Sequence, residues 1–355
     1  MSGPHKAGDL IQERYEVIDD AGEGGMQFVY AAKDLELKRN VALKTPKNDS
    51  AKKRFQRSAI VSARVNHPNV AKTLDYLEYD KRQYLVEELI EGTDMDKALL
   101  KKAKYLDPYL AARIFHYLAK GLAASHHAGV IHRDLKPSNV MVTGGFQLSS
   151  IKITDFGIAK MADEEIAEVV EGGGESISAS RTVVGALPYM APEAIETPRE
   201  VGKPADVWSI GAMMYELLAG NVPYGKGLPA VTKIMEAKPP GFPTFMTSNP
   251  QFATLSNQLI QIVLQCLQKN PTARPTADVI VEQCNTLCYP VEHRCFGTVH
   301  KMPNQHWGFI NVNGEDVFFH KDCVYGDKPV IGDSVMLSTF RGGGARRALP
   351  VVKVQ

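Results

Sequence analysis

The sequence predicts an α+β fold of two lobes, the first rich in strands and the second in helices, followed by a small all-β barrel. Apolar residues alternate from Tyr15 to Lys44 and again over 83–89, as they do in strands. After Gly92 they recur at helical spacing, over 109–129, 205–220 and 256–268. Beyond about residue 290, short β-type runs separated by Gly, Asn, Asp and Pro predict the barrel.

Length and charge set the first limits. A chain of 355 residues exceeds one average domain, so one large and one small domain are expected. The net charge of +1 gives no global field that would recruit nucleic acid or membrane, so any such binding must come from a local patch. The first ten residues lack the apolar core of a signal peptide, and no uncharged apolar run approaches the ~18 residues of a membrane span. We therefore expect a cytoplasmic protein with no membrane partner.

The cysteines indicate reduced thiols. An odd, sparse number in a chain of this size favours a cytosolic protein over a disulfide framework. The region 284–295 holds three cysteines and His293, which could be metal ligands, but their spacing fits no common zinc pattern. Structural or incidental thiols are therefore expected at Cys266, Cys284, Cys288, Cys295 and Cys323.

The first lobe contains two weak signals. A glycine-rich turn, Gly22-Glu23-Gly24-Gly25-Met26-Gln27-Phe28-Val29, lies between two predicted strands, where such turns usually just close a hairpin. Val41-Ala42-Leu43-Lys44 places a lysine at the end of an apolar strand, where it is usually a solvated edge residue. A helix is expected over 51–66.

The second lobe contains more specific motifs. His132-Arg133-Asp134-Leu135-Lys136-Pro137-Ser138-Asn139 is followed at a short distance by Asp155-Phe156-Gly157, and Ala191-Pro192-Glu193 ends the segment. In order and spacing, these motifs and the two of the first lobe resemble the protein kinases, specifically the bacterial serine/threonine type. Asp206-Val207-Trp208-Ser209-Ile210-Gly211 and Arg274 also match. The resemblance implies a kinase fold over 11–289, with an N-lobe over 11–90 and a C-lobe over 91–289.

The resemblance also implies ATP and Mg²⁺ as cofactors and the serine or threonine of a protein as substrate. Phosphoryl transfer concentrates negative charge on phosphate oxygens, so its catalysis is mainly positioning and electrostatics. Asp134 would orient the attacking hydroxyl and take its proton, and Lys136 would neutralise the γ-phosphate. Asn139 and Asp155 would supply oxygen ligands to Mg²⁺.

The nucleotide would lie between the lobes. Glycine backbone N–H groups can approach phosphates because no side chain blocks them, and Lys44 would contact the α- and β-phosphates. The implied nucleotide-binding positions are Gly22, Gly24, Gly25, Val29, Lys44, Glu87 and Glu88.

The sequence departs from the family pattern at three places. Gln27 replaces the third glycine of the loop, and Ala186 stands where a threonine usually follows the glycine of the substrate-facing loop. More seriously, the helix glutamate that normally pairs with the strand lysine corresponds to Ser58, and 51–66 contains no Asp or Glu.

Glu87 is a candidate replacement for that glutamate. It falls at the family's gatekeeper position at the rear of the nucleotide pocket, where a buried carboxylate is costly unless it is paired. Our hypothesis is that Glu87 pairs with Lys44. The alternative is a one-residue shift of the alignment that leaves Glu87 exposed.

Regulation by phosphorylation is a further expectation. Arg133 precedes Asp134, and a phosphate on the activation segment could pair with an arginine and order the segment. The candidate hydroxyls are those of Ser176, Ser178, Ser180 and Thr182.

The last part of the chain resembles a cold-shock domain, a five-stranded oligonucleotide-binding (OB) barrel, over about 294–355. The resemblance rests on Trp307-Gly308-Phe309-Ile310 and Val317-Phe318-Phe319-His320, which flank the turn Asn313-Gly314. By strand alternation Trp307, Phe309, Phe318 and His320 can share one face, where aromatic rings can stack on unpaired bases of single-stranded RNA or DNA. The alternative is that these aromatics belong to the core or dock onto the kinase domain. Cations near that face are Lys301, Lys321, Arg341, Arg346 and Arg347.

Two functions from different classes follow. The first is a Mg-ATP-dependent serine/threonine protein kinase with a C-terminal domain that binds single-stranded nucleic acid. The second is a catalytically weak pseudokinase that acts as a scaffold for nucleotide and RNA or DNA, and the serine at position 58 is the main argument for it.

Overall fold

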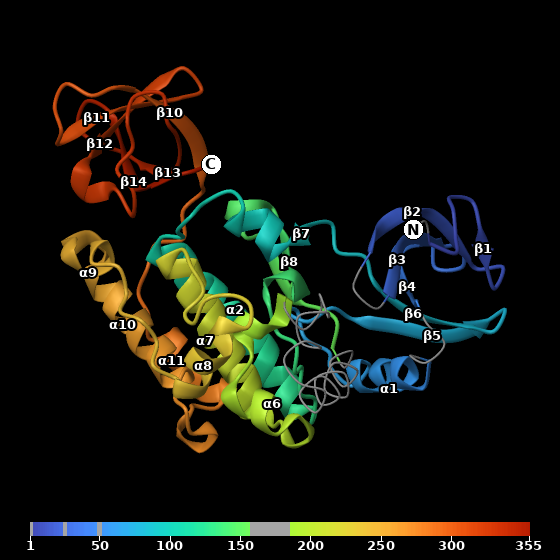
Figure 1. Ribbon diagram of the computed structural model, residues 1–355. Coiled ribbons are helices and arrows are strands. Elements are labelled where there is room, and N and C mark those ends of the chain that lie inside the picture. Colours follow the sequence, from blue (N-terminus) through green and yellow to red (C-terminus); the bar gives the residue numbers. More distant parts are fainter. Residues whose placement is uncertain (1–2, 24–26, 48–51, 157–184) are drawn as a thin grey trace.

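The expected division into two lobes and a barrel is present in the computed structural model (Figure 1). The structure describes residues 3–23, 27–47, 52–156 and 185–355. The first lobe is a six-stranded sheet with strand order β1-β2-β3-β4-β6-β5 and one helix, α1. Its elements are β1 (Leu10–Ile11), β2 (Tyr15–Glu23), β3 (Gln27–Asp34), β4 (Arg39–Pro46), α1 (Lys52–Ser62), β5 (Thr73–Tyr79) and β6 (Arg82–Glu88).

The second lobe is helical around a small three-stranded sheet. Helices α2 and α7 form its centre, and both are buried along most of their length because their apolar residues face neighbours on several sides. Its elements are β7 (Thr93–Asp94), α2 (Pro108–His127), β8 (Val140–Thr143), β9 (Ser150–Ile153), α6 (Pro192–Glu196), α7 (Lys203–Ala219), α8 (Pro229–Glu236), α9 (Phe245–Ser248), α10 (Pro250–Cys266) and α11 (Ala277–Asn285).

Helix α2 shows why the chain is helical where the spacing predicted it. Asp107 caps its N-terminus by accepting hydrogen bonds from the backbone N–H groups of Tyr109 and Leu110. Pro108 occupies the first helical position, where it loses no hydrogen bond. The helix ends before Gly129, whose φ of +74° turns the chain away.

The C-terminal strands close into a barrel of order β10-β11-β12-β14-β13. Each of the five predicted β-type runs forms one strand, and the inward-facing residues of the strands fill a core of their own. The strands are β10 (Cys295–Lys301), β11 (Trp307–Val312), β12 (Glu315–His320), β13 (Ser334–Phe340) and β14 (Arg346–Lys353).

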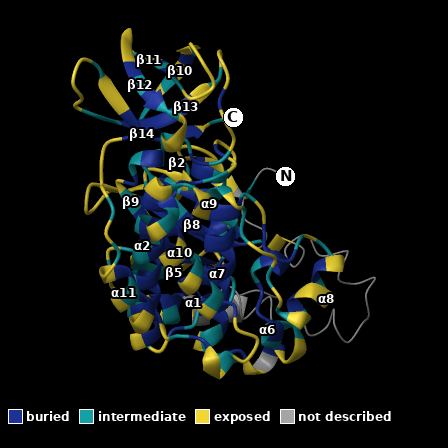
Figure 2. Ribbon diagram, turned by 90° about the vertical axis from the view of Figure 1, so that its left-hand side faces the viewer, coloured by how far each residue is buried: buried dark blue, intermediate teal, exposed yellow. Residues whose placement is uncertain are grey.

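The barrel is packed directly onto the C-lobe, on the side away from the N-lobe (Figure 1). Tyr325 is buried between Phe245 and Phe252, with ring centroids 5.1 and 5.3 Å away. Met336 and Val352 also belong to the core that includes the C-lobe helices. The barrel therefore shares apolar packing with the kinase-like region and is not merely tethered to it. Figure 2 shows buried residues at this boundary.

A buried ion pair reinforces the boundary. Arg294 Nη2 lies 2.8 Å from Oδ1 of Asp107, and both side chains are buried. Gln147 bonds the backbone of Arg294 twice, because its side-chain amide donates to the Arg294 carbonyl and its amide oxygen accepts from the Arg294 N–H. Breaking a buried pair of this kind usually costs several kcal/mol, so it helps to fix the barrel on the C-lobe.

Within the described ranges, no helix is both long and apolar enough to span a membrane. In the same ranges, no group of three or more His, Cys, Asp and Glu residues is arranged to hold a metal, and all five cysteines are free.

Candidate functional site

The loop with the His132 motif is held by a buried carboxylate. Asp206, on α7, accepts hydrogen bonds from the backbone N–H groups of His132 and Arg133, at 2.8 and 2.7 Å. The ring of His126 lies 2.9 Å from the same carboxylate. Arg133 has a φ of +66°, a conformation that is rare outside glycine and persists where the surroundings impose it. The helical core thus fixes the direction in which the next residue points.

Asp134 is that next residue, and two polar side chains contact it. Lys136 Nζ lies 2.9 and 2.8 Å from its two carboxylate oxygens. Asn139 Nδ2 donates to the Asp134 carbonyl at 2.7 Å and to its Oδ2 at 3.0 Å. The carboxylate is therefore oriented by two neighbours and remains partly accessible to a hydroxyl.

Lys44 lies in the centre of the N-lobe sheet and contacts two carboxylates. Its Nζ is 2.6 Å from Glu87 Oε2 and 2.7 Å from Asp155 Oδ1. The register of the sheet explains the first contact. Glu87 on β6 lies opposite Ala42 on β4, so Lys44, two residues further on, projects from the same face. The buried, paired arrangement of Glu87 is present, and the exposed alternative is not.

Lys44 and Asp155 hold each other in the charged form, whereas burial acts against the charge of Glu87. Burial alone would lower the pKa of Lys44, but the Asp155 and Glu87 carboxylates outweigh it and hold that pKa above its ordinary value. Burial raises the pKa of Glu87, and Lys44 only partly offsets this. Burial would also raise the pKa of Asp155, but the attraction of Lys44 outweighs it and the pKa is lowered. Lys44 therefore remains a cation beside an ionised Asp155.

Gln27 is part of this cluster, although the sequence indicated only that it replaces a glycine. It is buried at the start of β3, and its Nε2 donates to Asp155 Oδ1 at 2.9 Å. Val29, two residues further on, is the partner of Lys44 in the β3–β4 ladder, so Gln27 and Lys44 share one face of the sheet. The side chain at the third glycine position thus links the glycine-rich loop to the proposed metal ligand. In the family pattern this position is simply a missing glycine, so the sequence did not predict the contact between Gln27 and Asp155.

Asn139 and Asp155 fit a magnesium ion. The Asn139 amide nitrogen is already engaged by Asp134, which leaves its amide oxygen free to act as a ligand. The Asn139 carbonyl accepts from the N–H of Thr154 at 2.9 Å, so the segments that carry the two ligands are tied together. Asp155 has a φ of +61°, again a conformation imposed by its surroundings. Carboxylate and amide oxygens are the ligands that this hard cation prefers.

The other predicted nucleotide-binding positions are placed as follows. Gly22 and Val29 face each other across the β2–β3 ladder. The side chain of Glu88 is directed away from Lys44, because it accepts from Lys152 Nζ at 2.8 Å and from the Lys72 N–H at 2.7 Å. Gly24, Gly25, Ser176, Ser178, Ser180 and Thr182 lie outside the described residues, as does the side chain of Ser58.

Glu193, from the last kinase-like motif, is paired with Arg274. Arg274 Nη1 and Nη2 lie 2.5 and 2.8 Å from the two Glu193 oxygens, and the guanidinium stacks 4.9 Å from the centre of the Trp208 ring. Two motifs that are 81 residues apart in the sequence are thereby joined at the base of the C-lobe.

The four residues of the predicted nucleic-acid face lie together on the barrel. Trp307 pairs with His320, and Phe309 pairs with Phe318, across β11 and β12. The three rings of Trp307, Phe309 and Phe318 lie within 6.0 Å of one another, centroid to centroid, and are half-buried. Arg347 neighbours Phe318 on β14 and is exposed. We call these four residues, Trp307, Phe309, Phe318 and His320, the aromatic face. None of them is among the buried residues of the barrel core or of the barrel's contact with the C-lobe.

Known proteins are similar to this chain over its first three quarters. The family model for the protein kinase domain matches residues 15–284. A probable serine/threonine-protein kinase of Clostridium perfringens is 31% identical over 272 residues, which cover 75% of this chain and 37% of that protein. The serine/threonine-protein kinase PknB of Mycobacterium tuberculosis is 30% identical over 273 residues, which cover 74% of this chain and 41% of that protein. The chain thus spans about two fifths of the length of these curated relatives.

A solved structure has the same fold. The crystal structure of the Mycobacterium tuberculosis PknI kinase domain aligns with a TM-score of 0.56 and 24% identity, over 80% of this chain and 99% of that domain. The family match, the two relatives and the geometry of the motifs agree. This chain belongs to the protein kinase family, with a bacterial-type serine/threonine kinase domain.

Proposed function

We propose that this chain is a serine/threonine protein kinase that transfers the γ-phosphoryl group of ATP, with Mg²⁺, to a protein hydroxyl in the cytoplasm. The kinase domain would extend over 11–289. The observation that carries the proposal is the pairing of Lys44 with both Glu87 and Asp155. Lys44 thus has a glutamate partner, as the strand lysine of a kinase normally does, although helix α1 contains no glutamate.

Each side chain then has a defined part in the transfer. Mg²⁺, held by Asn139 and Asp155, would neutralise charge on the phosphates. Lys44 would bind the α- and β-phosphates, and Glu87 would hold its ammonium in place. Asp134 would accept a hydrogen bond from the substrate hydroxyl and take its proton as the new P–O bond forms. Lys136, already beside that carboxylate, would offset the charge on the transferred group.

The test is transfer of labelled γ-phosphate from ATP, with Mg²⁺, to the chain itself and to a generic basic protein. We expect label on serine or threonine, identified after hydrolysis of the product. Label on tyrosine alone would contradict the substrate class. Nucleotide binding without any transfer would favour the pseudokinase scaffold instead.

The barrel supports a second function. We infer that residues 294–355 form a cold-shock-like domain that binds single-stranded RNA or DNA. Three half-buried rings on one sheet face, with exposed Arg347 beside Phe318, match what unpaired bases and their phosphates require. The barrel packs onto the C-lobe through other residues, so the aromatic face remains available to a ligand.

Exchanging Phe318 for Ala is expected to weaken binding of a labelled single-stranded oligonucleotide about tenfold, since base stacking on one ring contributes ~1–3 kcal/mol. Fluorescence anisotropy over a range of salt concentrations measures the affinity. Binding should also weaken as salt rises, because phosphate contacts release counterions. The matched control is Tyr79→Ala, which removes an exposed ring on β5 of the N-lobe, outside the aromatic face. Equal affinities of Phe318→Ala and wild type would exclude the aromatic face as the binding site.

A further inference from the structure

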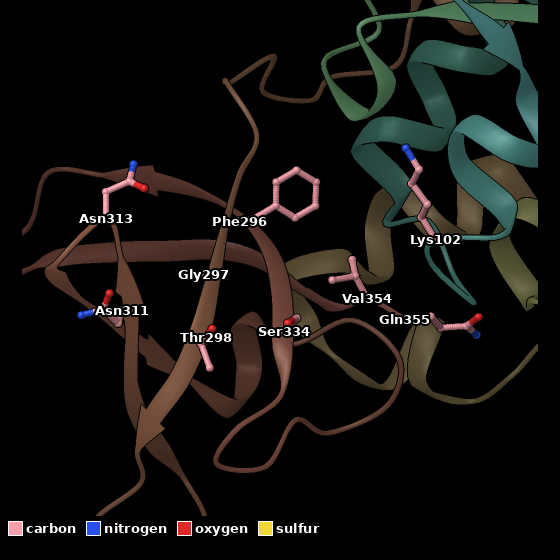
Figure 3. Close-up of a pocket in the computed structure, with 9 residues that line it drawn as sticks. All are labelled: Lys102, Phe296, Gly297, Thr298, Asn311, Asn313, Ser334, Val354 and Gln355. Atoms are coloured by element: carbon pink, nitrogen blue, oxygen red, sulfur yellow. The ribbon is translucent and has the colours of Figure 1, made fainter.

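A hollow of about 510 Å³ lies where the barrel meets the C-lobe. Figure 3 shows the residues that line it, and we call it the junction hollow. Most of them come from β10, β11 and the start of β13, but Lys102 comes from the C-lobe. The residues on which the following argument depends are Phe296, Thr298, Asn311, Asn313, Ser334 and Lys102.

The junction hollow is continuous with the aromatic face. Phe309 and Asn311 project from the same side of β11, because they are two residues apart. Asn311 lies opposite Thr298 on β10, and Thr298 lies opposite Ser334 on β13. Phe296 follows two residues further along the same side of β10. About four residue steps, or ~14 Å, therefore separate Phe309 from the level of Phe296 along the strands.

Phe296 is an exposed ring in a defined position. It is 53% exposed, which is unusual for a large apolar side chain in a barrel whose other outward rings are half-buried. One edge of it packs against Phe146 of the C-lobe, at a centroid distance of 5.9 Å in a T-shaped arrangement. This contact orients the ring without covering it. A ring that is held in place and open to solvent is a stacking platform for a base.

Lys102 adds a positive charge on the opposite side. Three exposed lysines lie close together in this part of the C-lobe, and two of them are paired: Lys101 with Asp96 at 2.7 Å, and Lys104 with Asp327 at 3.5 Å. Within the described part of the chain, Lys102 has no carboxylate partner. Lys102 lines the junction hollow on the C-lobe side, across from Phe296 (Figure 3). An ammonium on one side of the hollow and a ring on the other suit the phosphate and the base of one nucleotide.

The remaining polar groups suit a nucleotide better than an apolar peptide. Thr298 and Ser334 offer hydroxyls, and Asn311, Asn313 and Gln355 offer amides that can both donate and accept. All five residues are exposed. Asp316 lies opposite Asn311 on β12, and its carboxylate is near the proposed route of the strand. This carboxylate is 2.8 Å from His300 Nε2, so it has a partner.

We propose that the junction hollow binds a nucleotide of the same single strand that crosses the aromatic face. The base stacks on Phe296 and the phosphate meets Lys102, so the kinase C-lobe forms part of the nucleic-acid site. This inference rests on the proposed function of the barrel. It adds that the strand bridges the two domains, which are already packed together.

The test compares two labelled oligo-dT strands of ~4 and ~10 nucleotides on the full chain, since one OB barrel spans ~4–16 nucleotides. The short strand can cover the aromatic face alone, whereas the long one also reaches the junction hollow. Lys102→Gln is expected to weaken the long strand about fivefold and to lower the slope of log affinity against log salt by ~0.7, the value for one phosphate contact on a single strand. Phe296→Ala is expected to weaken the long strand about tenfold. Neither variant should change binding of the short strand.

Lys101→Gln is the matched control, because it removes the same charge from a lysine that is already paired. Lys102 is exposed, so its variant keeps the test decisive if Phe296→Ala loosens the contact with Phe146. Wild-type affinity of Lys102→Gln for the long strand at every salt concentration would overturn the proposal, and so would an equal loss in Lys101→Gln.

Three further outcomes separate the possible failures. If dTMP alone bound with an affinity that depends on Lys102, and strand length made no difference, the junction hollow would belong to a free nucleotide and the strand proposal would be wrong. If wild type bound neither strand, the proposed function of the barrel would fail together with this inference. If Phe318→Ala lost both strands while Lys102→Gln lost neither, only this inference would fail.

Discussion

Asp134→Asn is expected to lower phosphoryl transfer about 10³-fold while ATP binding and the fold stay close to wild type. The amide has the size of the carboxylate but cannot take a proton from the substrate hydroxyl. It also removes the negative charge that holds Lys136 Nζ at 2.8–2.9 Å, so this lysine loses its fixed position next to the transferred group. Both losses fall on the chemical step, because the nucleotide would be bound mainly by groups on the N-lobe.

Initial rates of transfer from labelled ATP measure this loss, and binding of a fluorescent ATP analogue shows whether the nucleotide site survives. Asp278→Asn is the matched control, since Asp278 is exposed on α11 and its one ion-pair partner among the described residues is His127, at the surface. Asp134→Asn activity above about a tenth of wild type would contradict a role as proton acceptor, whose contribution is typically ~10²–10⁴-fold.

The order of the motifs predicted the fold well because the residues proposed to act in catalysis are also close together in the sequence. Asp134, Lys136 and Asn139 lie within six residues, and one buried anchor, Asp206, is enough to orient them. The five barrel strands were predicted for a similar reason, since short alternating runs with turn residues between them are typical of strands.

Contacts between distant segments were harder to predict. The Arg294–Asp107 pair joins residues 187 positions apart. Nothing in the sequence around either residue distinguishes it from a charged residue at the surface. The packing of Tyr325 into the C-lobe is similar, because a tyrosine after a barrel strand could equally belong to the barrel core. The sequence therefore predicted two domains but not the surface between them, on which the junction hollow depends.

Glu87→Gln is the second change with a large expected effect, a loss of about 10²-fold in phosphoryl transfer, in line with the cost of removing one partner of a buried ion pair. Lys44 would keep Asp155 as its one carboxylate partner among the described residues. The lysine would then be drawn toward the carboxylate that Mg²⁺ needs, and away from the phosphates. The fall should therefore include a weaker apparent affinity for Mg²⁺, seen as a shift of the magnesium titration to higher concentrations.

Glu78→Gln controls for the loss of a carboxylate in the same sheet, because Glu78 is exposed on the neighbouring strand β5. A second-site change gives the sharper test. A glutamate at Ser58 restores the family pattern, so Ser58→Glu in the Glu87→Gln protein should recover part of the activity if the defect is the missing partner of Lys44. Full activity of Glu87→Gln alone would instead mean that Lys44 is positioned without it. Since α1 contains no Asp or Glu, Glu87 is the residue of the N-lobe sheet that is seen to pair with Lys44. It lies two residues out of register with Lys44 on the same face, so a strand would here supply the partner that a helix usually supplies.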